Sequence, residues 1–275
     1  MKRFPEKRIV ITGAGSGLGK TLAIDFAKMG WRVVVSSRTQ SRIDQTVHDI
    51  KEAGGTVLGV QCDVSEYDNV AALADKVVAE WGGVDIVINN AGVPSGGYVE
   101  TFSLEDWKWI MDINLMGTIH RCKAFIPILK KQGSGHIANV SSAAGFTSMA
   151  EMAPYNVTKA GIISLSETLK MELYGENIGV TVAVPTFFQT NLLENVRYTD
   201  EIQLKRAEAY FEKAFCDVNH VSKKLIKGIK KNKLYVLPQI DARFYWRFKR
   251  FAPELFFKTL AVSYHKGWID KYLGV

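Results

Sequence analysis

The chain has 275 residues, of which 47 % are hydrophobic and 23 % charged, and its formal net charge is +7 at pH 7. These values are typical of a globular protein and exclude disorder over most of the chain. No apolar run reaches the length of a membrane span or a signal-peptide core, and the three cysteines lack a metal-binding spacing. We therefore expect a cytoplasmic protein with reduced thiols and no metal site.

Short β-branched runs alternate with amphipathic stretches along the chain. Near-continuous apolar runs of this length favour strands buried on both faces, and their alternation with helices predicts a doubly wound parallel sheet of the Rossmann type. The predicted strands are 8–12, 31–37, 56–64, 84–92, 135–142, 179–185 and 234–238. We find no internal repeat, and we predict that 190–217 is mostly helical.

The first predicted strand runs into the sequence TGAGSGLGK. Gly13, Gly17 and Gly19 give it the spacing TGxxxGxG, with Ser16 and Leu18 between them. Glycines allow a tight turn against a pyrophosphate, and the helix that follows directs its N-terminal NH groups at the phosphates. The position of this loop between a strand and a helix predicts a dinucleotide site, although a glycine-rich turn alone is a weak signal.

The end of the second predicted strand indicates which dinucleotide binds. An acidic residue at this point bonds the ribose hydroxyl of NAD, whereas an arginine accommodates the 2′-phosphate of NADP. The sequence reads VVVSSRT, with Ser37 and Arg38 and no acid. This favours NADP(H) over NAD(H); the alternative is that Arg38 is a solvated loop residue.

Two further strand ends belong to the predicted cofactor cleft, because open α/β sheets bind ligands at the carboxyl ends of their strands. Asp63 and Val64 close the third predicted strand, where Asp63 can meet an adenine amino group. Asn90, Ala91 and Gly92 close the fourth, although a turn of this composition can be purely structural.

The stretch APYNVTKAG places Tyr155 and Lys159 four residues apart, hence on one face of a helix. A free tyrosine has a pKa near 10, too high for efficient proton exchange at neutral pH. We expect Lys159 to favour the phenolate and lower that pKa. Ser142, at the end of the fifth predicted strand, is placed to hydrogen-bond a carbonyl oxygen beside the phenol.

TGxxxGxG, NNAG, a serine and YxxxK, in this order and at these spacings, resemble the classical short-chain dehydrogenase/reductase family over about residues 7 to 238. The resemblance implies that Tyr155 is the general acid/base, that Lys159 binds the nicotinamide ribose and tunes the tyrosine, and that Ser142 orients the substrate. It also implies that Asn114, in MDINLMG, holds a water in the proton relay. The alternatives are a kink or capping role for Asn114 and Ser141 as the working serine.

The sequence after the sixth predicted strand, AVPTFFQTNLL, departs from the family pattern. Thr186 stands where many relatives have glycine, which makes the roles of Pro185, Thr186 and Thr190 in a nicotinamide carboxamide pocket less secure. We assign the substrate-binding residues to Ser142, Met149, Phe187, Phe188 and Leu192. Because no arginine cluster accompanies them, the predicted substrate is an apolar ketone or aldehyde, of a lipid, 3-oxoacyl, steroid or retinoid type, or the corresponding alcohol.

The predicted function is thus an NADP(H)-dependent carbonyl reductase; the alternative is a non-catalytic NADP-binding sensor or scaffold. We divide the chain into a Rossmann-fold catalytic and NADP-binding domain with a helical lid, 1–240, and a C-terminal extension, 241–275. The family resemblance implies a homo-oligomer, a dimer or a tetramer.

The extension is rich in aromatic and basic residues. On one helix Phe244, Phe248, Phe251 and Leu255 would share a side, and Pro253 can begin a second helix. This pattern is consistent with peripheral membrane contact or with a protein contact. No nucleic-acid motif accompanies the charge, so we predict no nucleic-acid partner.

Overall fold

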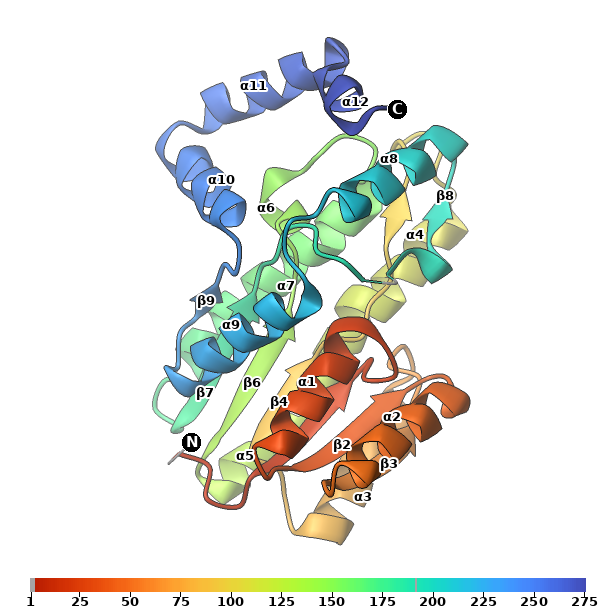
Figure 1. Ribbon diagram of the computed structural model, residues 1–275. Coiled ribbons are helices and arrows are strands. Elements are labelled where there is room, and N and C mark those ends of the chain that lie inside the picture. Colours follow the sequence, from red (N-terminus) through yellow and green to blue (C-terminus); the bar gives the residue numbers. More distant parts are fainter. Residues whose placement is uncertain (1–2, 191) are drawn as a thin grey trace.

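A computed structural model describes residues 3–190 and 192–275. Its centre is a parallel sheet of seven strands (Figure 1). Across the sheet the strands are β3 (Thr56–Gln61), β2 (Arg32–Ser37), β1 (Arg8–Thr12), β4 (Ile86–Asn89), β6 (Gly135–Val140), β7 (Ile178–Ala183) and β9 (Tyr235–Val236). All seven predicted strands are therefore confirmed, as is the doubly wound architecture.

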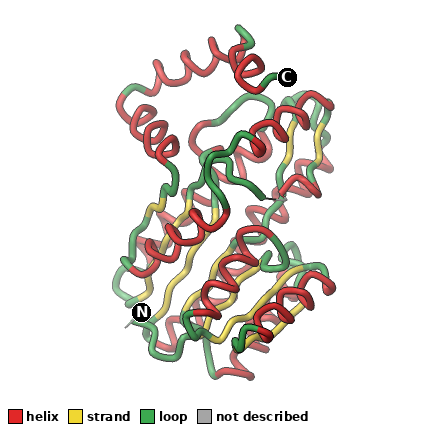
Figure 2. Tube along the Cα trace, in the orientation of Figure 1, coloured by secondary structure: helices red, strands yellow, loops and turns green. Residues whose placement is uncertain are grey.

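Helices cover both faces of the sheet, so the strands are sandwiched in three layers (Figure 2). One face packs against α1 (Gly17–Lys28), α2 (Gln40–Glu52) and α9 (Val218–Lys230). The other packs against α3 (Tyr67–Trp81), α5 (Gly117–Gln132) and α7 (Ala153–Glu172). Alternate strand residues enter the two cores: Ile9 and Ile11 enter the first, and Val10 enters the second. This alternation is the period of two that a strand imposes on its side chains.

The segments between β4 and α5 and between β6 and α9 build the upper part of the molecule in Figure 1. They comprise α4 (Leu104–Ile110), the π-helical segment η1 (Met111–Met116), α6 (Ala144–Thr147), the 3-10 segment η2 (Leu192–Asn195) and α8 (Glu201–Glu212). A second sheet of two short parallel strands, β5 (Ser95–Gly96) and β8 (Arg197–Tyr198), joins the loops there. The sequence did not predict this small sheet.

The C-terminal extension forms three helices, α10 (Ile240–Phe251), α11 (Pro253–His265) and α12 (Trp268–Leu273), which arch over the top of the molecule (Figure 1). Pro253 begins α11, as predicted. The predicted single stripe is only partly correct, because Leu255 lies on α11 and Phe248 packs edge-on against Phe256, with 5.4 Å between ring centroids. No helix in the described ranges is long and apolar enough to span a bilayer.

Candidate active site

A cleft of about 1210 Å³ opens at the carboxyl ends of the strands. It lies where the strand order reverses between β1 and β4, the position at which open α/β sheets bind ligands. Most of the predicted site residues line it: Gly13, Ser16, Gly17, Leu18, Ser37, Arg38, Asp63, Val64, Asn90, Ala91, Gly92, Ser142, Met149, Tyr155, Lys159, Pro185, Thr186, Phe187, Phe188, Thr190 and Leu192. Of the predicted set, Gly19 and Asn114 lie behind its wall.

The glycines after β1 allow the backbone of this loop to pack closely on itself and on the loop after β4. Gly17 has φ of +50°, a conformation that side chains disfavour. A Cβ on Gly19 would lie 2.6 Å from Asn90 Nδ2 and closer still to the carbonyl oxygen of Gly13. Asn90 Nδ2 itself donates to the Thr12 and Gly13 carbonyls, at 3.1 and 3.3 Å, which ties the β4 loop to the β1 loop.

The N-terminus of α1 faces this loop without a competing internal cap. Ser16 is extended and makes no side-chain cap hydrogen bond, and the first turn of α1 carries no acidic residue. Its free NH groups and positive dipole end therefore suit an anionic group. The residues present thus fit a dinucleotide pyrophosphate at this position.

The end of the cleft beyond β2 is basic. Arg38 is exposed, and Arg42 one turn later in α2 also lines the cleft, where it pairs with Glu194 at 2.6 Å. Sequence reasoning missed Arg42, although its spacing from Arg38 was a signal for it. Asp63 is held by Ser65, which donates from its backbone N at 3.0 Å and from its hydroxyl at 2.7 Å.

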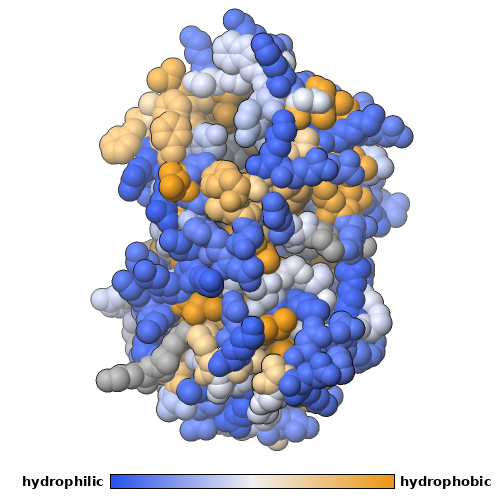
Figure 3. Space-filling view, viewed as in Figure 1, coloured by the Kyte–Doolittle hydropathy of each residue, from blue (hydrophilic) through white to orange (hydrophobic). Residues whose placement is uncertain are grey.

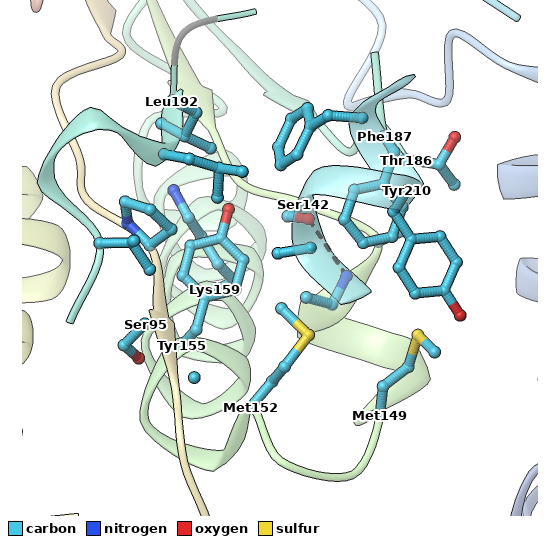
Figure 4. A pocket seen from close by; sticks show the side chains of 18 of the residues that line it. Ser95, Ser142, Met149, Met152, Tyr155, Lys159, Thr186, Phe187, Leu192 and Tyr210 are labelled. Carbon is cyan, nitrogen blue, oxygen red and sulfur yellow. Dashed lines mark hydrogen bonds between the residues drawn. The ribbon is translucent and has the colours of Figure 1, made fainter. Parts of the chain in front are cut away.

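Ser142, Tyr155 and Lys159 meet over the centre of the cleft (Figure 4). Helix α7 begins with Pro154 in its first turn and presents Tyr155 and Lys159 on one face. Lys159 Nζ lies 5.4 Å from the Tyr155 ring centroid and donates to the Val140 carbonyl at 3.2 Å. The Ser142 hydroxyl accepts from the backbone N of Ala144 at 3.2 Å and donates to the Pro185 carbonyl at 3.4 Å.

The pKa of Tyr155 differs from the sequence expectation. Burial raises it to about 12, and the Ser142 hydroxyl lowers it only in part. The expected net lowering of this pKa is not found, because burial of the phenol dominates. Burial and then the positive charge of Arg121 lower the Lys159 pKa to about 8. The phenol is consequently protonated at neutral pH, as a proton donor to an alkoxide must be.

Asn114 lies in the π-helical segment η1 and is fully buried. Its side chain exchanges two hydrogen bonds with the backbone of Val93, at 2.8 and 2.9 Å, and also donates to Thr158 at 3.2 Å. Asn114 thus lies in a π-helical turn, a kind of turn that recurs at functional sites, and its role in a proton relay stays a prediction. Ser141 donates instead to the Lys159 carbonyl at 2.7 Å, and it is 3 % exposed, so Ser142 has the freer hydroxyl.

The substrate end of the cleft is mostly apolar and aromatic. Met149 and Met152 flank Ser142, and the Phe187 and Tyr210 rings stack with their centroids 4.4 Å apart (Figure 4). Phe188 lines the cleft but also packs against the core beneath α9, so it is partly a core residue.

Helices of the extension complete this end of the cleft, a role that sequence reasoning did not predict. The lining residues that they contribute are Asp241, Tyr245, Phe256, Phe257, Leu260, Ala261, Ser263, Tyr264, His265, Trp268, Ile269 and Tyr272. Most of these side chains are apolar or aromatic. The cleft is therefore walled on one side by the Rossmann domain and on the other by α10–α12.

A cluster of hydrogen-bonded polar side chains joins the two walls. We call it the polar clasp, and it consists of Tyr98, Glu151, Arg206, Tyr264 and Asp270. Arg206 on α8 donates to both carboxylate oxygens of Glu151, at 2.8 and 2.7 Å, and to both of Asp270 on α12, at 2.7 and 2.8 Å. Glu151 also accepts from the hydroxyls of Tyr264 and Tyr98, at 2.6 and 2.7 Å. Burial alone would raise the Glu151 pKa, but these donors outweigh it and lower the pKa.

The departure at Thr186 has a structural counterpart in the extension. Thr186 donates from its backbone N to Gln239 at 3.2 Å and from its hydroxyl to Asp241 at 3.1 Å. Gln239 Nε2 returns bonds to the Thr186 and Phe187 carbonyls, at 3.4 and 3.3 Å. A threonine hydroxyl thus ties the β7 loop to the start of α10, which a glycine could not do.

Known proteins share both the sequence pattern and the fold. Residues 7–201 match the family model for short chain dehydrogenase. The chain belongs to the short-chain dehydrogenase family. The matched residues include the glycine loop, Ser142, Tyr155 and Lys159. The family model ends at Glu201, the first residue of α8, so it leaves the rest of α8, then α9, β9 and the extension uncovered.

Individual relatives are of several kinds. The chain is 31 % identical over 239 residues to the probable oxidoreductase EphD of Mycobacterium tuberculosis; the match covers 84 % of this chain but only 40 % of that relative's length. It is 31 % identical over 194 residues to the 3-oxoacyl-[acyl-carrier-protein] reductase FabG of Thermotoga maritima, covering 70 % of this chain and 79 % of FabG. A short-chain dehydrogenase/reductase of Burkholderia phymatum, solved in complex with NAD, superposes with a TM-score of 0.86 at 31 % identity, covering 93 % and 96 % of the two chains.

Proposed function

We propose that this protein is an NADP(H)-dependent reductase of apolar ketones or aldehydes. The observation that carries the proposal is the meeting of Ser142, Tyr155 and Lys159 at the centre of a cleft whose far end is apolar. In this proposal Ser142 hydrogen-bonds the substrate carbonyl and Tyr155 donates the proton that the product hydroxyl requires. Lys159 binds the nicotinamide ribose and stabilises the phenolate that remains. Buried Asn114 connects η1 to helix α7, which carries Tyr155 and Lys159.

The apolar walls indicate the substrate class. Met149, Phe187 and Leu192 face the reacting groups, and the aromatic side chains of α11 extend the apolar surface away from them. A cleft that continues this far suits a long or bulky apolar molecule, such as a lipid-derived aldehyde, a long-chain 3-oxoacyl group, a steroid or a retinoid. The match to a 3-oxoacyl reductase agrees with one member of this set.

A graded series of aliphatic aldehydes and ketones tests the proposal. Turnover of each compound is measured by the oxidation of NADPH. We expect kcat/KM to rise with chain length and to fall at least about a thousand-fold in Tyr155→Phe, because loss of a general acid costs about this factor. Tyr174→Phe, at a tyrosine that is 86 % exposed, is the matched control. Retention of NADPH binding without turnover of any member of the series would favour the alternative, a cofactor-binding sensor.

The proposed preference for NADP(H) depends on Ser37 and Arg38, with Arg42 beside them. Two observations support recognition of a 2′-phosphate: Arg38 and Arg42 line the cleft beyond β2, although Arg42 pairs with Glu194, and no carboxylate occupies the end of β2. We expect NADPH to bind at least about ten-fold more tightly than NADH, and Arg38→Leu to weaken NADPH alone. Equal affinities of the wild type for NADPH and NADH would contradict this assignment. The test is needed because the Burkholderia phymatum relative was solved with NAD.

The predicted homo-oligomer and the predicted cytoplasmic location stay predictions. Size-exclusion chromatography with light scattering measures the first directly. Fractionation of the cells that make the protein measures the second.

A further inference from the structure

Helix α10 carries an exposed apolar stripe. Ile240, Phe244 and Phe251 are 75 %, 61 % and 89 % exposed, and with Arg247 they recur at intervals of four, three and four residues. Such spacing places all of them on one side of the helix. Leu255, at the start of α11, adds a further side chain that is 56 % exposed. Large apolar side chains gathered in this way indicate an interaction surface rather than a solvated face.

A basic hollow lies beside this stripe. It has a volume of about 480 Å³ between α9 and α10, and it is lined by the cations Lys224, Lys227, Lys231, Lys233, Arg243 and Arg247. Its other lining residues are uncharged. None of these cations forms a salt bridge with any residue in 3–190 or 192–275. The hollow therefore holds a concentrated positive charge that the described chain does not neutralise, which suits phosphate groups.

The stripe and the hollow form one surface, because Arg247 belongs to both. Figure 3 shows this side of the molecule, with apolar side chains over α10 and α11 and hydrophilic ones below them along α9. Neither Phe244 nor Phe251 lines the reductase cleft, and nor does any lysine of the hollow. The surface is thus separate from the candidate active site.

We propose that this surface docks on an anionic lipid bilayer. Phosphate headgroups would pair with the basic hollow while Ile240, Phe244 and Phe251 enter the boundary between headgroups and acyl chains, as in other basic amphipathic helices rich in aromatics. A second copy of this chain fits less well. A two-fold interface centred on the surface would bring the same patch of each copy together, and hence cations against cations.

Flotation of the full chain with lipid vesicles tests the proposal. We expect strong binding to phosphatidylcholine vesicles that contain about one third phosphatidylglycerol, little binding to phosphatidylcholine alone, and weaker binding as salt is added. The double variants Phe244→Ser/Phe251→Ser and Lys227→Glu/Lys231→Glu should each bind the anionic vesicles at least about ten-fold more weakly.

Matched controls separate this surface from general stickiness and from misfolding. Leu104→Ser/Met171→Ser removes two apolar side chains that are 87 % and 81 % exposed elsewhere, and Lys28→Glu/Lys51→Glu reverses two exposed charges elsewhere. Both should bind vesicles as the wild type does. All variants should melt as the wild type does and retain its NADPH affinity, since none of these residues lines the cleft.

Several results would overturn the proposal. They are failure of the wild type to float with anionic vesicles, equal binding to neutral vesicles, unchanged binding by both surface variants, and equal loss of binding in the control variants. A change of oligomeric state in Phe244→Ser/Phe251→Ser with vesicle binding intact would assign the stripe to a contact between copies instead. Binding of inorganic phosphate or duplex DNA to the hollow without vesicle binding would also reject the bilayer.

Discussion

Glu151→Gln tests whether the polar clasp holds the extension over the cleft. The wild-type carboxylate accepts two hydrogen bonds from Arg206 and one each from Tyr264 and Tyr98, and its side chain is 8 % exposed. The amide keeps one acceptor oxygen but turns an NH2 group toward donors. Net contributions of hydrogen bonds to charged groups are about 1.5–3 kcal/mol. Because Arg206 keeps both bonds to Asp270, we expect the lower part of this range, about 2 kcal/mol of unfolding free energy.

Urea unfolding at pH 7 measures this difference, with Glu80→Gln, at an exposed glutamate of α3, as the control. The native pKa of Glu151 is lowered, so the carboxylate stabilises the fold above its unfolded pKa of about 4.5 and this contribution is lost as pH falls through the native pKa. The gap between wild type and Glu151→Gln should therefore narrow below about pH 4.5.

Proteolysis localises the effect. If the loss of about 2 kcal/mol favours local detachment of α11 and α12, trypsin should cleave these helices up to roughly thirty-fold faster. The reason is that the cleavage rate follows the fraction of molecules in which the helices are detached. If Glu151→Gln is as stable as Glu80→Gln and is cleaved at the wild-type rate, the reasoning is refuted. The clasp would then contribute nothing measurable to holding the extension in place.

Three further predictions concern the cofactor loop, a buried lysine and a buried histidine. Gly19→Ala should weaken NADPH binding at least about ten-fold, because its Cβ would lie 2.6 Å from Asn90 Nδ2. The control Gly175→Ala, whose Cβ meets open space, should leave the affinity unchanged. Equal NADPH affinities of Gly19→Ala and the wild type in a fluorescence titration would contradict this prediction. Ketone reduction should fall above about pH 8 as Lys159 loses its proton, while a rate that is flat to pH 10 would show that its charge is not used. The pKa of His136 is lowered to about 3 by burial and then by Arg3 and Lys170, so neutral His136 stabilises the fold fully above its unfolded pKa of about 6.5, and this stability declines as pH falls toward 3. The unfolding free energy should drop by about 1.4 kcal/mol at pH 5.5 from this group, a drop absent in His136→Gln and retained in the exposed control His265→Gln.

The sheet could be predicted from the sequence because the signals for it are local. Each strand is a short β-branched run, and the ligand-binding loops follow the strands directly, so Gly13, Asn90 and Ser142 could be placed at one edge of the sheet before the structure was known. The two-residue strands β5 and β8 carry no such run. Their pairing depends on loops that only the tertiary fold brings together.

The clasp and the pKa of Tyr155 lay beyond sequence reasoning for a different reason. Glu151, Arg206 and Asp270 belong to three segments with no shared pattern, and only the tertiary fold brings them together. The spacing of Tyr155 and Lys159 gives their proximity but not their burial, and burial is the larger effect on both pKa values.

The bonds between the β7 loop and the start of α10 have a mechanical consequence. Gln239, immediately before α10, bonds the peptide groups of Thr186 and Phe187, and Asp241, in the first turn of α10, accepts from the Thr186 hydroxyl. A tilt of α10 would therefore act on the loop that borders the reacting groups directly through these side chains, and not only through the backbone between residues 187 and 239. The extension and that loop would then move together, because Gln239 bonds them at the point where the extension begins.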